Sequence, residues 1–285
     1  AELSQPIQLG GMTLKNRIVM SPMTRGRSPG GVPNALNAEY YAQRAEAGLV
    51  FAESTAISPE GAGILDSPNI FNAEHLAGWK LVTSEVHRRG GRIVLQLFHC
   101  GHNLHPLLHP RGEVPFGPSA IPARGLMRTP QGRLPLETPR ELRVDEIPGV
   151  IAEYVRAAEL AMEAGFDLVE VHSGNAYLLD QFLRDSTNKR TDAYGGSPEN
   201  RRRLLMQVTE AVIGVWGRER VGVRISPTNP STYEITDSDP ETLFTCVVEG
   251  LQQLGIAFLD VVEGGTGDTP AQCPFDFGKL RKIFK

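Results

Sequence analysis

Short apolar runs rich in valine, isoleucine and leucine alternate along the chain with longer segments in which apolar residues recur every three or four positions. The short runs are typical of buried strands, and the longer period is typical of amphipathic helices. Their alternation predicts βαβ units around a parallel sheet. The predicted strands cover residues 17–22, 49–57, 92–99, 167–172, 221–226 and 257–263, and the predicted helices cover residues 34–47, 74–89, 147–164, 198–216 and 239–254.

The regular succession of these units favours a (β/α)8 TIM barrel over a doubly wound sheet, because no GxGxxG motif opens the first helix. Residues 275–285 form a sixth predicted helix. At about 30 residues per unit, a closed barrel needs on the order of 60 residues more. We therefore expect one barrel domain over residues 1–285, with strands 7 and 8 absent from the chain. Glycines predicted to cap helix ends are Gly48, Gly90, Gly165, Gly217 and Gly255.

One connection is unusually long. Residues 100–143 are rich in proline, glycine and arginine and show no sustained period, which predicts a loop or small subdomain over one mouth of the barrel. Within it, His102, His105 and His109 lie close together, but prolines 106 and 110 prevent a helix from aligning their rings, so we predict no metal site. A glycine-rich run at 264–269 lacks the lysine of a phosphate-binding loop.

Composition narrows the function classes. The 285 residues are 40% hydrophobic and 22% charged, with a net charge of -4 and a pI near 6.0, which is typical of a globular protein and indicates no nucleic-acid or anionic-membrane partner. The cysteines, Cys100, Cys246 and Cys273, are odd in number and fit no metal-ligand spacing, so a disulfide framework is not predicted. With no signal-peptide pattern and no apolar run near the ~18 residues of a spanning helix, the expected location is the cytoplasm.

Polar side chains interrupt the ends of successive predicted strands. In barrel enzymes the reacting groups lie at the carboxyl ends of the strands, so these residues are candidates for one site. The candidates are Thr24 after the first strand, Ser54 on the second, Gln96 and His99 on the third, His172 and Asn175 at the fourth, and Arg224 on the fifth.

Several segments resemble the old yellow enzyme family of flavin-dependent ene-reductases, in the same order and at similar spacing. These segments are "LKNRIVMSPMTR", "QLFH", "VHSGNAYLLDQFLRDSTNKRTDAYGGSPENR", "VGVRISP" and "VVEGG". The resemblance implies a (β/α)8 barrel that holds FMN at its mouth. It also implies that NADPH or NADH reduces the FMN, which then reduces the C=C bond of a small enone-type substrate.

The resemblance implies a cofactor role for six residues. Thr24 is similar to the residue that hydrogen-bonds the flavin C4 carbonyl, and Gln96 to the amide that contacts the pyrimidine edge. Arg224 resembles the cation beside flavin N1 and O2, where a permanent charge favours the reduced cofactor. The remaining cofactor-binding residues are Pro22 and Met23 beneath the ring and Ser54 near its edge.

The resemblance also implies the catalytic residues. His172 and Asn175 are similar to the pair that donates hydrogen bonds to the substrate carbonyl oxygen, where charge grows during hydride transfer. Tyr177 is similar to the proton donor to the α-carbon. Phe98 replaces the family's usual tryptophan and, with His99, is expected to line the substrate pocket. Ala176 replaces the usual glycine, which raises the backbone cost if φ is positive there.

Other interpretations remain open at this stage. A non-flavin barrel lyase or isomerase could use His172 and Tyr177 as acid and base, and a flavin-binding or scaffold relic could lack turnover. In the family, strands 7 and 8 bind the FMN phosphate, so a missing C-terminal segment or a complementing chain is a further expectation. The arginines of the long connection form a solvated face or, alternatively, bind the phosphates of the reducing dinucleotide; they are Arg124, Arg128, Arg133, Arg140 and Arg143.

Overall fold

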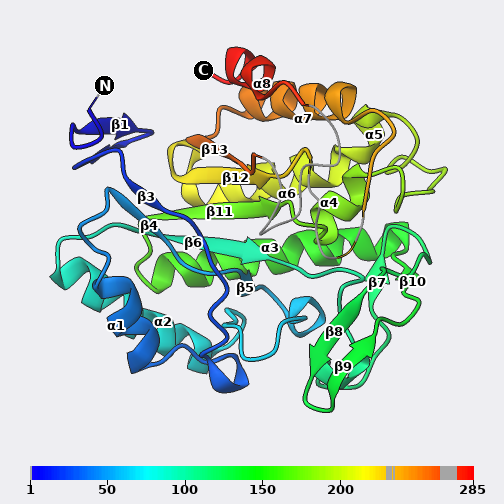
Figure 1. The fold of residues 1–285 in the computed structure, drawn as a ribbon, viewed down its shortest axis with the longest axis horizontal. Helices are drawn as coiled ribbons and strands as arrows, with labels where there is room; N and C mark the ends of the chain where they lie inside the picture. Colours follow the sequence, from blue (N-terminus) through cyan, green and yellow to red (C-terminus); the bar gives the residue numbers. More distant parts are fainter. Residues whose placement is uncertain (1, 229–232, 234, 264–274) are drawn as a thin grey trace.

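The computed structural model describes residues 2–228, 233, 235–263 and 275–285. Its centre is a parallel sheet with the strand order β13-β12-β11-β6-β4-β3, with β5 also paired to β6 (Figure 1). This order confirms the predicted succession of barrel strands; strands 7 and 8 of a closed barrel are not among the described residues. The strands are β3 (Val19–Met20), β4 (Leu49–Phe51), β5 (Thr55–Ala56), β6 (Ile93–Phe98), β11 (Leu168–Ser173), β12 (Val221–Ile225) and β13 (Phe258–Val261).

Helices follow most of these strands and cover one face of the sheet (Figure 1). In the parts of the chain that are described, no helix has both the length and the apolar character needed to cross a bilayer. The α-helices are α1 (Ala35–Ala42), α2 (Ala73–Arg88), α3 (Ile147–Glu163), α4 (Leu178–Leu183), α5 (Pro198–Arg201), α6 (Arg203–Trp216), α7 (Pro240–Leu254) and α8 (Phe277–Ile283), and the 3-10 helices are η1 (Pro29–Gly31), η2 (Pro59–Gly61), η3 (Pro106–Leu108), η4 (Val144–Glu146) and η5 (Arg218–Arg220).

The two faces of the sheet have different roles. On β11, Val169 and Val171 join the large apolar core formed with the helices, whereas Leu168 belongs to a separate cluster on the inner face. Successive side chains of a strand point to opposite faces, so Glu170 and His172 lie on the inner face with Leu168. The same alternation orients the other barrel strands. The inner face is therefore apolar near the amino ends of the strands and polar near their carboxyl ends.

An N-terminal hairpin, which the sequence pattern did not predict, closes the apolar end of the inner face. Strands β1 (Ile7–Leu9) and β2 (Met12–Leu14) pair antiparallel, and their apolar side chains pack against the inner cluster. The turn needs glycine, because Gly10 has φ +51 and an added Cβ would lie 2.1 Å from the carbonyl oxygen of Glu219. The hairpin lies at the opposite end from the polar side chains.

Several predicted elements differ in their bounds, and the strand predicted over 17–22 is reduced to β3. The second predicted strand is interrupted between β4 and β5, and the helix predicted over 34–47 ends at Ala42 because the next residues form successive tight turns. Gly48 is not a left-handed cap; it allows close approach, since a Cβ there would lie 2.1 Å from the Asn16 carbonyl oxygen. The helix predicted over 198–216 is divided into α5 and α6 at Arg202.

The long connection contains its own strands. β7 (Phe116–Gly117) pairs with β10 (Arg140–Glu141), and β8 (Leu126–Thr129) forms an antiparallel hairpin with β9 (Gly132–Pro135). Figure 1 shows this hairpin on the side of the sheet where β6 and β11 end. Met127 anchors it, because its side chain lies in a small apolar cluster that includes Tyr233, from the segment after β12.

Candidate active site

Strand register brings the polar side chains of the inner face together. Glu170 on β11 lies opposite Gln96 on β6, and His172 lies opposite Arg224 on β12. Arg224 in turn lies opposite Asp260 on β13. Parallel strands in register place these side chains in neighbouring layers of one surface. Residues separated by up to 164 positions in the sequence therefore form one polar surface near the carboxyl ends of the strands.

A short hydrogen-bond chain links Ser54, which lies between β4 and β5, to Gln96 on β6 and Glu170 on β11. The Ser54 hydroxyl donates to Oε1 of Gln96 at 2.6 Å, and Nε2 of Gln96 donates to Oε2 of Glu170 at 2.6 Å. Glu170 is fully buried, and burial raises its pKa to about 8, with the Asp260 carboxylate adding to the rise. The amide predicted to contact the flavin is thus held at both ends by protein groups.

The charge of Arg224 is partly balanced. Its guanidinium donates to Oδ2 of Asp260 at 2.6 Å, while its Nε has no hydrogen-bond partner among the described residues. Burial and the Arg224 cation together hold the pKa of His172 well below its usual value. His172 is therefore neutral at physiological pH, which is the form in which imidazole has one donor and one acceptor nitrogen.

The turn after β11 positions Asn175 and Tyr177. Asn175 has φ +55 and Ala176 has φ +64, so the substitution of alanine for glycine leaves the backbone left-handed and incurs a strain cost. The turn is held by buried hydrogen bonds: the Asn175 N–H donates to Ser226 Oγ at 2.8 Å, and the Ala176 N–H donates to Asp180 Oδ2 at 3.0 Å. Asp180 is itself paired with buried Arg184 at 2.8 Å.

Tyr177 lies between an aromatic ring and the imidazole. Its ring centroid is 4.6 Å from that of Phe98 and 5.2 Å from that of His172, both with edge-to-face geometry. Burial raises the pKa of the phenol above its ordinary value, with smaller contributions from Tyr233 and Cys100. The hydroxyl therefore stays protonated at neutral pH, as a proton donor must be.

The segment after β3 is held at the same end of the sheet by a hydrogen bond to Glu53. The Arg25 N–H donates to Glu53 Oε2 at 2.7 Å, and the Tyr41 hydroxyl donates to Glu53 Oε1 at 3.1 Å. Glu53 is fully buried, and this burial raises its pKa. Its carboxyl group thereby fixes the backbone beside Thr24. The predicted cofactor residues Pro22 and Met23 precede Thr24 in this segment, which is largely exposed.

His99 is not brought into this group. It follows Phe98 on β6 and turns its ring toward Phe116 of β7, with 5.0 Å between ring centroids. Its Nδ1 accepts a hydrogen bond from the Gly101 N–H at 3.0 Å. Of the two residues expected to line the substrate pocket, Phe98 therefore contacts Tyr177, while His99 packs within the protein.

The sequence interpretation did not single out several residues that support the site. Two of them carried a sequence signal, because Glu53 and Glu170 are acidic residues inside otherwise apolar strand runs. Asp180, Arg184 and Ser226 gave no comparable signal, since a polar residue near a strand end or on a helix is ordinary. Their contribution depends on contacts between the turn after β11 and the end of β12.

Buried polar atoms without partners gather at this end of the inner face. Among the described residues, Nδ1 of His172, Oδ1 of Asn175, Nε of Arg224 and Oε1 of Glu170 lack hydrogen bonds. Buried polar atoms are nearly always paired in folded proteins, so a group of unpaired ones indicates a ligand. The set of a guanidinium, a carboxamide, a neutral imidazole and a carboxyl group offers both donors and acceptors, which fits the pyrimidine edge of FMN and a carbonyl compound.

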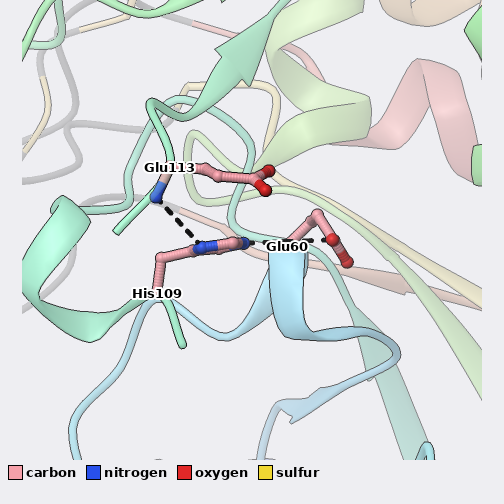
Figure 2. Close-up of side chains that lie close together, drawn as sticks. All are labelled: Glu60, His109 and Glu113. Carbon is pink, nitrogen blue, oxygen red and sulfur yellow. Dashed lines mark hydrogen bonds and ion pairs between the residues drawn. The ribbon is translucent and has the colours of Figure 1, made fainter. Parts of the chain in front are cut away.

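A second cluster lies apart from the inner face. Figure 2 shows Glu60, His109 and Glu113, whose potential ligand atoms lie within 4.8 Å of one another. Nδ1 of His109 accepts hydrogen bonds from the Arg111 and Glu113 N–H groups, each at 3.2 Å, so the ring proton is on Nε2, which a metal ion would need free. Arg111 pairs with both glutamates. The trio is an ion-pair cluster, and we assign no metal to it.

The glycine-rich run at 264–269 and Cys273 lie outside the described residues. Cys100 and Cys246 are free thiols and form no disulfide bond with each other.

Comparisons with known proteins agree with this geometry. Residues 2–271 match the profile of the NADH:flavin oxidoreductase / NADH oxidase family. The chain is 43% identical to 12-oxophytodienoate reductase 7 of Oryza sativa. The match covers 92% of this chain and 69% of that protein. It is 46% identical to flavin oxidoreductase hxnT of Emericella nidulans over 84% of its length, spanning 62% of that protein.

Solved structures show the same similarity. The old yellow enzyme homologue of Zymomonas mobilis is 44% identical and superposes with a TM-score of 0.96 over 100% of this chain and 80% of its own. Morphinone reductase in complex with tetrahydroNAD is 43% identical, with a TM-score of 0.94 over 100% of this chain and 78% of its own. The chain thus spans 62% to 80% of the length of these relatives.

Proposed function

The chain belongs to the NADH:flavin oxidoreductase / NADH oxidase family, and we propose that it is an FMN-dependent ene-reductase acting on α,β-unsaturated carbonyl compounds. The observation that carries this proposal is that His172 and Arg224 lie opposite each other on β11 and β12. The group assigned to the substrate oxygen thus stands beside the cation assigned to the flavin. Bound FMN would supply hydride-transfer chemistry between a nicotinamide and the β-carbon of the substrate, and Gln96 and Arg224 would hold it.

The protein residues divide the remaining work. Neutral His172 and Asn175 donate hydrogen bonds to the carbonyl oxygen, where negative charge accumulates in the transition state. Tyr177 gives its hydroxyl proton to the α-carbon. Gln96 and Arg224 hold the pyrimidine edge of the cofactor, and the cation offsets the negative charge that the reduced cofactor carries. Thr24, in the segment that Glu53 fixes, would supply the hydrogen bond to the flavin C4 carbonyl.

Acid–base chemistry by a lyase or isomerase has less support. A general base works best when its pKa is near the working pH. Burial and the Arg224 cation lower the pKa of His172, so its imidazole is a weak base near neutral pH. Hydride chemistry needs no such titration, because it requires only a neutral donor and a protonated phenol.

Anaerobic reduction tests the proposed function. We expect the protein reconstituted with FMN to lose its flavin absorbance when NADPH or NADH is added and to regain it when an enone such as 2-cyclohexenone follows. Steady-state rates should give parallel double-reciprocal lines, because nicotinamide and enone occupy the same face in turn. Bleaching without enone-dependent reoxidation would indicate a flavin-binding protein without turnover.

The hairpin of β8 and β9 is our proposed contact for the dinucleotide. Arg128 and Arg133 lie directly opposite each other on its exposed face, and no ion pair of either arginine occurs among the described residues. Like charges opposite each other in a hairpin are destabilising, and an anion between them relieves the repulsion. The hairpin packs against Tyr233, which follows β12. It therefore adjoins the mouth of the barrel over which residues 100–143 are predicted to lie.

Replacing both arginines by alanine should raise the KM for NADPH about tenfold, the loss expected for one charge-assisted hydrogen bond to phosphate. The KM for the enone should not change. The control is Arg156→Ala, which removes an exposed arginine from α3. Equal increases in the KM values for NADPH and NADH would indicate that the two arginines bind the pyrophosphate. A larger increase in the KM for NADPH would indicate that they bind the 2′-phosphate. Unchanged values for both would contradict the proposal.

A further inference from the structure

Glu170 is a buried carboxyl group to which neither the reaction nor the sequence resemblance assigns a role. It lies on β11, two positions before His172, and its Oε2 accepts a hydrogen bond from Nε2 of Gln96 at 2.6 Å. Its other oxygen, Oε1, is buried and has no partner in the described part of the chain. A buried carboxyl group half satisfied in this way is costly unless it serves a purpose.

The contacts of Gln96 allow two arrangements in which Oε2 of Glu170, the carboxamide and the Ser54 hydroxyl are all paired. With Glu170 ionised, the carboxylate accepts the Gln96 N–H and the Ser54 hydroxyl donates to the Gln96 oxygen, as observed. With Glu170 protonated on Oε2, the oxygen that contacts Gln96, its hydroxyl needs an acceptor, and Gln96 offers one only if its carboxamide is turned end for end. Ser54 accommodates both arrangements, because a hydroxyl can donate or accept.

We infer that Glu170 is a positioning residue that acts on the cofactor through Gln96, its ionisation deciding which end of the carboxamide faces the pyrimidine edge of the flavin. This inference rests on the proposed function, because it requires FMN beside Gln96. The turn exchanges a donor for an acceptor at that edge without moving the backbone. It also adds or removes one negative charge beneath the cofactor.

The groups that face Glu170 favour ionisation changes near neutral pH. Arg224 on β12 stabilises the carboxylate, whereas Asp260 on β13 and the apolar surroundings oppose it. His172, on the same strand, is neutral, and toward the amino ends of the strands the inner face is apolar, where Phe51 and Phe258 pack against each other. Burial is the largest cause, and the pKa of Glu170 rises to about 8. The carboxyl group is then protonated below this pH and ionised above it.

The reduction potential of bound FMN gives the test. Reduction adds two electrons and one proton to the flavin and leaves it negatively charged, so an ionised Glu170 disfavours the reduced cofactor. Two like charges on the order of 10 Å apart at an effective dielectric of about 20 change the equilibrium by about tenfold. For a two-electron couple a tenfold change is ~30 mV.

We therefore expect the reduction potential of Glu170→Gln to equal that of the wild type at pH 6. Above pH 9 its potential should be higher than that of the wild type by ~30 mV, which corresponds to the tenfold change in the equilibrium. The matched control is Glu153→Gln on α3, whose partly buried carboxyl group also has a raised pKa, about 7, but lies on the outer side of the sheet. Glu153→Gln should follow the wild type at every pH. A gap that is absent, or constant from pH 6 to 9.5, would overturn the assignment of Glu170.

Two further measurements keep the test decisive. If Glu170→Gln does not fold, the wild type alone provides the test. Titration of Glu170 should make the reduction potential fall more steeply with pH around pH 8. A single constant slope would contradict the assignment of Glu170. Infrared bands of the flavin carbonyl groups should shift between pH 6 and 9.5 in the wild type and not in Glu170→Gln; identical shifts overturn the carboxamide turn. Failure of all proteins to bind FMN would instead reject the proposed function.

Discussion

Tyr177→Phe is expected to slow enone-dependent reoxidation of the reduced protein by about 10²- to 10⁴-fold, the range for loss of a general acid. The Tyr177 ring packs edge to face against His172, and phenylalanine keeps its contact with Phe98 while removing only the proton donor. Reduction of the flavin by NADPH should remain near the wild-type rate, because that half-reaction uses no proton from Tyr177. Stopped-flow measurement of the two half-reactions separates these effects.

Tyr154→Phe is the matched control for this prediction. Tyr154 is a buried tyrosine on α3, and its hydroxyl makes no hydrogen bond among the described residues. Its replacement should leave both half-reactions unchanged. An equal loss in both half-reactions of Tyr177→Phe would show that the phenol supports the cofactor site and does not donate the proton.

Removal of the two donors should weaken binding of phenolic ligands, whose oxygen occupies the place of the substrate carbonyl. His172→Ala and Asn175→Ala are each expected to lower the affinity for p-hydroxybenzaldehyde by about 10²-fold or more, because each removes a preorganised donor worth ~3 kcal/mol. The rate of enone reduction should fall by a similar factor. Spectral titration of the FMN-bound protein measures the affinity directly.

A conservative variant distinguishes hydrogen bonding from packing. His172→Asn retains one N–H donor, so it should recover part of the affinity that His172→Ala loses. Because burial and Arg224 keep His172 neutral, its contribution should be constant between pH 6 and 8. Unchanged affinity in both alanine variants would remove the pair from the substrate site.

The sequence was sufficient for the order of the main elements. Alternating apolar runs and amphipathic segments predicted the six parallel strand positions, and the structure confirms them from β3 to β13. Such patterns are local, because a strand with helices on one side carries its own apolar signal. The β1–β2 hairpin was missed because each of its strands has only three residues, too few to show a period.

The motif around His172 also carried its chemistry in the sequence. The residues His172, Asn175 and Tyr177 lie within six positions, so their proximity required no knowledge of the fold. The structure adds the way in which the turn is held. Left-handed backbone at Asn175 and Ala176 is stabilised by Ser226 and Asp180, through contacts that no spacing along the chain predicts.

Charge balance and protonation states depended on the tertiary structure alone. The pairing of Arg224 with Asp260, the orientation of the Gln96 carboxamide by Ser54 and Glu170, and the neutrality of His172 each arise from strand register and burial. A residue's type defines which bonds it can make, but desolvation and the distance to a partner decide which it does make. The residue identities thus predicted a flavin enzyme with a barrel fold. The packing of distant strands determined the charge and hydrogen bonding of each group in the active site.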